Sequence, residues 1–279
     1  MGRVSFLSCI KRYIKGIQPI NVSVQNKIIE AGKLLDGKIA VVTGASRGIG
    51  LSIAKLYVTQ GAIVIGIAKY EETLAKAASE INSSNFKTIA FDMTRFEDYE
   101  ELMNKVLSYC PKEAIDILVN CAGLKNGQEA KFWKFNERQF DDCMAVNAKA
   151  PFFLSRLVAK NMINKGVKGN IINIIGIKGF IGEPSPYSMS KFALTSLTKG
   201  LARMLAPQGI AVNGIAPGAT NTSGRDNLFL TDTANGRFGT PEEVANIALF
   251  LASGLSSNMI GSIIICDGGE MLQYRNNRY

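Results

Sequence analysis

Histidine is absent from this 279-residue chain. Its absence excludes hydrolase triads built on histidine, imidazole zinc sites and histidine acid–base catalysis, because each of these needs an imidazole ring. Any proton transfer must therefore use tyrosine, lysine, cysteine or a carboxylate. We predict no metal site.

Cysteine and long apolar runs are also scarce. The five cysteines are scattered and odd in number, which favours reduced thiols in a cytoplasmic protein over a disulfide framework. No apolar run reaches the roughly 18 residues that a membrane span needs. Basic stretches interleaved with aromatics are missing from the body of the chain, so we expect no nucleic-acid binding. The net charge of +9 is diffuse, and it favours a phosphorylated cofactor.

Acidic residues are missing from the first part of the chain, where none precedes Glu30. We predict that residues 1–36 form a helical extension. We favour a helix that packs on the body of the protein or on a neighbouring subunit. The alternative is a surface-binding or organelle-targeting helix. Its apolar residues at helical spacing are Val4, Leu7, Ile10, Ile14 and Ile17, interleaved with Lys11, Arg12 and Lys15.

From Lys38 onward, β-branched runs alternate with helical patterns. This alternation predicts a single doubly wound (Rossmann) α/β domain over 37–271, followed by a polar tail over 272–279. Its parallel sheet should have about seven strands with helices on both faces and ligands at the carboxyl ends of the strands. The expected strands are Lys38–Val42, Ala62–Ile67, Phe86–Phe91, Ile115–Val119, Asn170–Ile175, Ile210–Ile215 and Ser262–Cys266, and the expected helices cover 51–58, 71–81, 95–109, 136–146, 147–165, 186–206 and 241–253.

A glycine-rich stretch, residues 43–50, lies where the first strand should turn into a helix. Gly44 permits a tight turn, Gly48 lets the backbone approach a pyrophosphate, and Gly50 allows close helix–strand packing. The helix N-terminus then offers free N–H groups to phosphates. The predicted phosphate-binding residues are Gly44, Ser46, Arg47, Gly48, Ile49 and Gly50.

Tyr187 and Lys191 lie one turn apart at the start of a helical pattern, so their side chains share a face. The pKa of a free tyrosine is near 10, too high for ready proton exchange at neutrality. A neighbouring ammonium should lower the pKa of Tyr187. The pair could then exchange a proton with a carbonyl or alcohol oxygen.

These motifs together resemble the short-chain dehydrogenase/reductase family, and its 3-oxoacyl-reductase-like branch in particular. The resemblance covers about Leu35 to Gly269 and predicts the same Rossmann fold. It rests on Thr43-Gly-x-x-x-Gly-x-Gly50, Asn120-Cys-Ala-Gly123, Asn147, Tyr187-x-x-x-Lys191 and Pro217-Gly218. By this resemblance Tyr187, Lys191 and Asn147 are catalytic, with Asn147 holding a water that links the lysine to solvent.

The resemblance also implies a nicotinamide dinucleotide cofactor. It assigns Asp92 to the adenine edge, and Lys191 to the nicotinamide ribose near Tyr187. The remaining lining residues are Asn120, Ala122 and Gly123 after the fourth strand, and Pro217, Gly218 and Thr222 over the nicotinamide.

The second strand ends at Ala68-Lys69, without the acid that would bind the ribose 2′-hydroxyl of NAD. Lys69 and Arg47 could instead clamp a 2′-phosphate. We therefore expect NADP(H) to be preferred, with NAD(H) possible.

One family residue is missing. The serine that orients the substrate carbonyl aligns with Gly176, and the loop from there to Tyr187 is about two residues short. We expect that Gly176 limits catalysis and that Gly176→Ser raises kcat/KM for carbonyl reduction about tenfold, because a hydroxyl there restores a hydrogen-bond donor. If glycine instead serves a special backbone angle, the substitution should cost stability.

Two functions follow. The leading one is an NADP-dependent oxidoreductase that transfers a hydride between the nicotinamide and a ketone, 3-oxoacyl thioester, sugar or polyol. The alternative is a cofactor-binding protein without turnover, either a sensor or a silent subunit. The resemblance also implies a homo-oligomer, tetramer or dimer. Its apolar surface would come from Phe152, Phe153, Leu157 and Met162.

Overall fold

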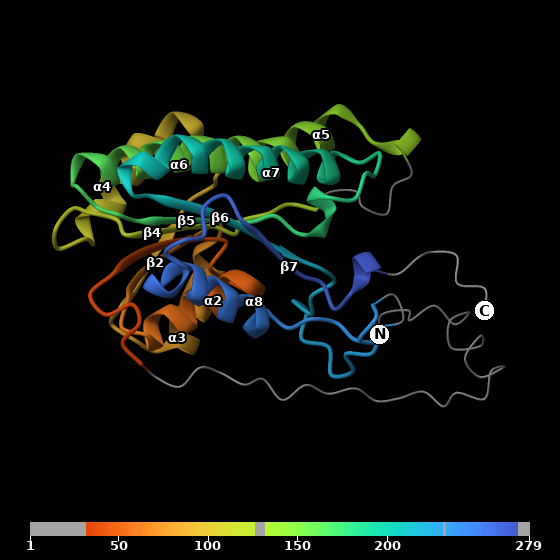
Figure 1. Ribbon diagram of the computed structural model, residues 1–279, viewed down its shortest axis with the longest axis horizontal. Helices are drawn as coiled ribbons and strands as arrows, with labels where there is room; N and C mark the ends of the chain where they lie inside the picture. Colours follow the sequence, from red (N-terminus) through yellow and green to blue (C-terminus); the bar gives the residue numbers. More distant parts are fainter. Residues whose placement is uncertain (1–31, 126–131, 231–232, 273–279) are drawn as a thin grey trace.

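The computed structural model describes residues 32–125, 132–230 and 233–272 (Figure 1). The helix expected over 1–36 and the tail expected over 272–279 lie outside these ranges, apart from their inner ends. The five residues from Gly32 to Asp36 lead directly into the first strand, and Leu35 is buried there.

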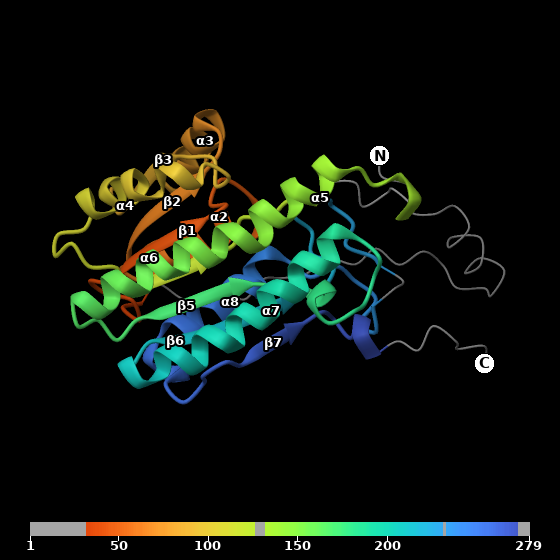
Figure 2. The same ribbon diagram turned by 90° about the horizontal axis from the view of Figure 1, so that it is seen from above.

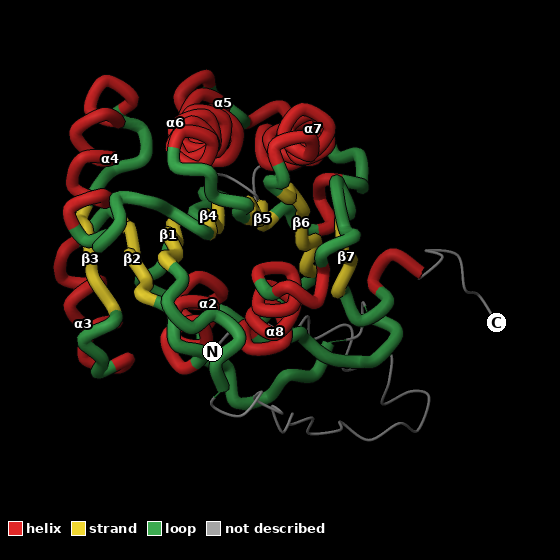
Figure 3. The backbone as a smooth tube through the Cα atoms, turned by 60° about the vertical axis from the view of Figure 1, so that its left-hand side comes forward, coloured by secondary structure: helices red, strands yellow, loops and turns green. Residues whose placement is uncertain are grey.

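A seven-stranded parallel sheet forms the centre of the molecule, in the order β3-β2-β1-β4-β5-β6-β7. Figure 3 shows the strands side by side between two layers of helices. The predicted doubly wound fold is therefore confirmed. The strands are β1 (Ile39–Thr43), β2 (Ile63–Ala68), β3 (Phe86–Ala90), β4 (Ile117–Asn120), β5 (Asn170–Ile174), β6 (Ala211–Pro217) and β7 (Ile263–Cys266).

The helices divide between the two faces of the sheet (Figure 1). The first layer holds α2 (Gly48–Thr59), α3 (Glu71–Ile81) and α8 (Pro241–Ala252). The second layer holds α4 (Tyr99–Ser108), α5 (Glu137–Met144), α6 (Ala150–Asn164) and α7 (Pro186–Leu205). Each layer covers its own apolar core, because strands buried on both faces send alternate side chains to opposite sides.

Two helical regions differ from expectation. The segment predicted as one helix over 95–109 begins with a 3₁₀ turn, Phe96–Asp98, before α4. The hydroxyl of Tyr99 donates to the Met93 carbonyl at 2.7 Å, which holds the chain back toward β3 at this point. The helices expected to meet at Asn147 instead form one rod, α5 to α6, joined by a π-helical turn at Ala145–Lys149 (Figure 2).

The π turn decides the direction of one predicted catalytic side chain. A π turn inserts an extra residue, and such insertions are frequent at functional sites. Asn147, in the middle of the turn, is fully buried on the sheet side of the rod. Sequence analysis divided the segment between residues 146 and 147, inside this turn, because apolar spacing alone does not distinguish a helix boundary from an inserted residue.

Candidate active site

The site lies at the carboxyl edge of the sheet, between β1 and β4. These strands are neighbours in space, although β2 and β3 come between them in sequence. Because the loops that follow β1 and β4 lead to opposite faces of the sheet, a crevice opens between them. The hydroxyl of Thr43 bridges the two loops by accepting hydrogen bonds from the backbone N–H of Cys121 at 3.0 Å and of Ala122 at 3.1 Å.

The glycine-rich loop is packed too tightly for side chains. A Cβ at Gly44 would lie 2.9 Å from the backbone nitrogen of Ala122, and one at Gly50 only 2.2 Å from the carbonyl oxygen of Gly44. Gly44 and Gly48 also have positive φ angles, +69° and +55°. The bare backbone and the start of α2 at Gly48 therefore form a cradle of the kind that binds phosphate. Ser46 and Ile49 are half-buried in it.

Lys69 and Asp92 meet beyond the ends of β2 and β3. The ammonium of Lys69 lies 2.7 Å from a carboxylate oxygen of Asp92, and this hydrogen bond raises the pKa of Lys69. Partial burial disfavours the charged form of Asp92, but hydrogen bonds from Lys69 and Thr94 hold the pKa of the carboxyl below its usual value. Arg47 is exposed at the N-cap of α2. Of the two cations that we expect to bind a 2′-phosphate, Lys69 is therefore already paired with an acid, whereas Arg47 is exposed.

Asn147 is held by hydrogen bonds on both sides of its amide. Its Oδ1 accepts from the Leu124 N–H at 2.8 Å, and its Nδ2 donates to the Leu124 carbonyl at 2.9 Å and to Ser190 Oγ at 3.0 Å. A Cβ at Gly123 would lie 3.6 Å from Asn147 Oδ1 and 3.8 Å from Lys191 Nζ. Asn147 and Lys191 therefore converge on the same glycine. Sequence analysis did not single out Ser190.

Tyr187 and Lys191 occupy the first turns of α7, whose N-terminus is capped by Ser185. The ammonium of Lys191 donates to the Ile174 carbonyl at 2.9 Å and lies 5.6 Å from the centre of the Tyr187 ring. Burial lowers the pKa of Lys191 to about 8. This geometry brings the predicted pair together at the end of β5.

The pKa of Tyr187 moves in the direction opposite to our expectation. Burial raises the pKa of the phenol, because a buried phenolate loses its hydration. The ammonium of Lys191 does not outweigh this effect of burial. Tyr187 therefore carries its proton at neutral pH, as a proton donor must. A bound positive nicotinamide would favour the phenolate in the oxidising direction.

Asn120 lies at the expected strand end, but its side chain joins a buried network. Its Nδ2 donates to Ser155 Oγ at 3.0 Å and to Asn173 Oδ1 at 2.8 Å, and Asn173 donates in turn to Thr198 at 2.9 Å. This network ties β4 and β5 to α6 and α7. The sequence signal for this network is Asn173, an amide within the apolar run of β5, because an amide buried in a strand needs hydrogen-bond partners.

Pro217 and Gly218 end β6 against the segment that follows β7. A Cβ at Gly218 would lie 2.8 Å from the Cα of Asp267, and the N–H of Ala219 donates to Glu270 Oε2 at 3.1 Å. The side chain of Thr222 lies against Gly48, where a Cβ would approach it to 3.1 Å. The loop after β6 therefore reaches the glycine-rich loop. Glu270 is a further residue at the site that sequence analysis missed.

Gly176 lies two residues after the end of β5 and faces Tyr187. Its φ of +82° and ψ of 157° lie in a region that only glycine occupies readily. Space for a side chain exists, since a Cβ would lie 3.6 Å from the Pro217 carbonyl oxygen and 3.9 Å from the Tyr187 hydroxyl. The glycine therefore serves a backbone angle, which favours the second of our two sequence-based alternatives.

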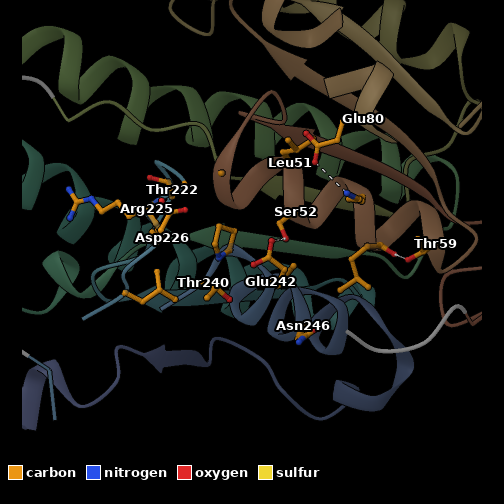
Figure 4. Close-up of a pocket in the computed structure, with 18 residues that line it drawn as sticks. Leu51, Ser52, Thr59, Glu80, Thr222, Arg225, Asp226, Thr240, Glu242 and Asn246 are labelled. Carbon is orange, nitrogen blue, oxygen red and sulfur yellow. Dashed lines mark hydrogen bonds and ion pairs between the residues drawn. The ribbon is translucent and has the colours of Figure 1, made fainter. Parts of the chain in front are cut away.

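A pocket of about 570 Å³ lies behind the glycine-rich loop, between α2 and α8 (Figure 4). It reaches Gly48 and Thr222 at one end, and Ser52 donates to Glu242 inside it at 3.4 Å. Tyr187 and Lys191 do not line it. Within the described ranges, no cluster of acidic or cysteine side chains could hold a metal ion, and no helix is both long and apolar enough to cross a membrane.

Comparison with known proteins agrees with this geometry. The family model for short chain dehydrogenases matches residues 38–232. Gluconate 5-dehydrogenase of Gluconobacter oxydans is 36% identical over 249 residues, which cover 84% of this chain and 95% of that protein. The 3-oxoacyl-(acyl-carrier-protein) reductase FabG of Vibrio harveyi is 35% identical over 244 residues, covering 84% and 98%.

A solved structure extends the comparison to three dimensions. A short-chain type dehydrogenase/reductase from Mycobacterium marinum aligns with a TM-score of 0.78 at 33% identity, covering 86% of this chain and 97% of that one. The glycine cradle, the converging Tyr187, Lys191 and Asn147, and the similarity over most of the chain agree with one another. The chain belongs to the short-chain dehydrogenase family of oxidoreductases.

Proposed function

We propose that the protein is an NADP-dependent oxidoreductase that transfers a hydride between the nicotinamide and a carbonyl or secondary alcohol. The observation that carries the proposal is the position of Tyr187, a buried phenol whose ring centre lies 5.6 Å from the ammonium of Lys191. A proton donor in that place is what the reduction of a carbonyl needs.

The residues of the crevice fit a dinucleotide. The cradle at Gly44, Gly48 and Gly50 would hold the pyrophosphate, because a Cβ at two of these positions would collide with backbone atoms. Lys191 would hold the nicotinamide ribose. Bound there, the cofactor supplies or accepts the hydride. The other proposed cofactor residues are Ser46, Arg47, Ile49, Lys69, Asp92, Asn120, Ala122, Gly123, Pro217, Gly218 and Thr222; Asn120 contributes through its backbone.

Tyr187 would move the proton. In reduction its hydroxyl donates to the carbonyl oxygen, and in oxidation its phenolate accepts from the alcohol. Lys191 stabilises the phenolate by its charge, and Asn147 orders the backbone of Leu124 beside it. Reprotonation of Tyr187 through a water held near Asn147 and Lys191 completes the cycle.

The substrate is a small molecule, and the relatives bracket its chemistry. Their names specify gluconate and 3-oxoacyl carrier thioesters, so sugar acids, polyols and oxoacyl compounds form the test panel. We expect NADPH oxidation with at least one ketone or thioester of the panel. Binding of NADPH without turnover of any member would support the alternative function, a cofactor-binding sensor or silent subunit, which the glycine at 176 favours.

We expect NADPH to bind more tightly than NADH, and Lys69→Asp to change the ratio of the two dissociation constants by about tenfold or more toward NADH. The substitution removes a cation from the 2′-phosphate and supplies an acid to the 2′-hydroxyl. Fluorescence titration with each cofactor measures both constants. Lys69→Met is the control, because it should weaken NADPH binding alone. Equal affinities of the unmodified protein for both cofactors would contradict the proposal.

We propose a homo-oligomer, tetramer or dimer, supported by apolar side chains exposed on the α6–α7 layer and on β7. Met162, which we expected at this surface, is buried in the subunit's own core, whereas Phe152 is 47% exposed. Light scattering at micromolar concentration should give a multiple of 30.2 kDa, and a monomer mass would contradict the proposal. Other exposed apolar residues are Ile163, Met189, Phe192, Met204, Ile260 and Ile265.

We also propose a cytoplasmic location. The four cysteines among the described residues, Cys110, Cys121, Cys143 and Cys266, are all free thiols. Free thiols persist in reducing compartments. Targeting to an organelle through the basic segment before Glu30 is the alternative, and imaging of a tagged full-length chain would distinguish the two.

A further inference from the structure

A second lysine lies against the Tyr187 ring. The ammonium of Lys125 is 5.4 Å from the ring centre, as close as that of Lys191 at 5.6 Å. The two lysines differ in their surroundings. Lys191 is buried and bound to the Ile174 carbonyl, whereas Lys125 is an exposed residue of the loop that follows β4. Lys125 is therefore a cation beside Tyr187 that is accessible from solvent.

The charges around Lys125 leave it without a close acidic partner. Its neighbour Lys178 is already ion-paired with Glu183, and Glu270 is engaged with the N–H of Ala219. Among the residues that the structure describes, no carboxylate lies within 4.0 Å of the Lys125 ammonium. Desolvation and the repulsion of Lys178 lower the pKa of Lys125, as expected for an ammonium short of counter-charge.

We propose that Lys125 binds a carboxylate of the substrate, so that the protein acts on oxo acids and the corresponding hydroxy acids. This inference rests on the proposed function, because it assigns the substrate class of the same site. The reacting carbonyl must contact the Tyr187 hydroxyl, and Lys125 contacts the same ring. The carboxylate must therefore lie within a few bonds of the reacting carbon.

The charge balance favours a carboxylate over a phosphate. Glu183 offsets Lys178, and the remaining charges of Lys125, Lys191 and Glu270 sum to one positive charge for the ligand. A single lysine ammonium matches a monoanion, whereas a phosphate dianion usually takes several donors. The carboxylate of Glu270 lies near enough to raise the pKa of Lys125, against the lowering by burial and by Lys178. Its negative charge further disfavours a dianionic ligand.

The test compares acids with their methyl esters, in which a small methyl group replaces the negative charge. Reduction by NADPH is measured for 2-oxobutanoate, 3-oxobutanoate and 4-oxopentanoate and for each ester. We expect kcat/KM for the preferred acid to exceed that for its ester by about tenfold or more, with most of the difference in KM, and to fall as salt is added. Lys125→Met should lower the rate with the acid at least about tenfold and leave the rate with the ester within about twofold.

Two variants separate charge from structure. Lys125→Arg keeps the cation and should retain the preference for the acid. Lys112→Met removes an exposed lysine at the opposite end of β4 and should change neither substrate. Equal rates for acid and ester, or an equal loss of both in Lys125→Met, would overturn the inference while the proposed function survives.

If none of the three acids is reduced, titration of the NADPH complex with each acid still tests the inference. Saturable, salt-sensitive binding that Lys125→Met abolishes would support the inference even though the proposed turnover fails. Absence of such binding for all three acids would overturn the inference.

Discussion

Tyr187→Phe is expected to lower kcat/KM for carbonyl reduction by about 10²–10⁴-fold, the usual contribution of a positioned proton donor. The substitution removes only the hydroxyl. The ring keeps its contacts with both lysine ammonium groups, so the melting temperature and the affinity for NADPH should stay close to those of the unmodified protein. Initial rates with an accepted ketone, a melting curve and a cofactor titration measure the three quantities.

Tyr57→Phe is the matched control. The hydroxyl of Tyr57 donates to the Ala248 carbonyl at 2.8 Å in the core between α2 and α8, away from the catalytic pair. Its removal should cost about 1–3 kcal/mol of stability, because the buried carbonyl loses its partner, and leave turnover unchanged. A folded Tyr187→Phe variant that reduces the ketone at the normal rate would contradict the proposed role of Tyr187.

Gly176→Ser is expected to destabilise the protein by about 1–3 kcal/mol. The φ of +82° and ψ of 157° at this position are strained for any residue with a Cβ, although the surroundings would accommodate the side chain itself. Turnover should not rise, because relief of the strain requires a backbone change next to Tyr187. Chemical unfolding and initial rates on the same preparation measure both effects.

Two further variants identify the cause of the loss. Gly176→Ala should lose as much stability as Gly176→Ser, since the backbone angle and not the hydroxyl is responsible. Gly182→Ser, in the same loop, has no heavy atom within 4 Å of its added Cβ and no positive φ, and it should change stability little. A Gly176→Ser protein of normal stability with raised turnover would show instead that only a hydroxyl is missing there.

The fold and the positions of the motifs could be predicted from sequence because both depend on local patterns. Alternation of apolar strands with amphipathic helices indicates a parallel sheet, and parallel strands place their loops at one edge. The glycine spacing of residues 43–50 and the four-residue spacing of Tyr187 and Lys191 each report a relation within one turn or one element. The structure brings these motifs to the same crevice.

What the side chains do in the crevice depends on partners that are distant in sequence. The amide of Asn120 joins a network with Asn173 instead of facing the cofactor cleft, and Lys69 pairs with Asp92 from the next strand. The π turn that buries Asn147 lies where the sequence predicted a boundary between two helices, because apolar spacing does not distinguish such a boundary from an inserted residue.

Electrostatics and backbone angles are likewise set by the assembled structure. A tyrosine beside a lysine suggested a lowered phenol pKa, yet burial raises the pKa of Tyr187, because the buried phenolate loses its hydration. The φ of Gly176 and the approach of Lys125 to Tyr187 follow from how β4, β5 and α7 pack. The sequence by itself determined which groups reach the carboxyl edge of the sheet, since local periodicity encodes strand and helix. Only the tertiary structure decided how each group is charged, paired and turned, since those properties arise from long-range packing and desolvation.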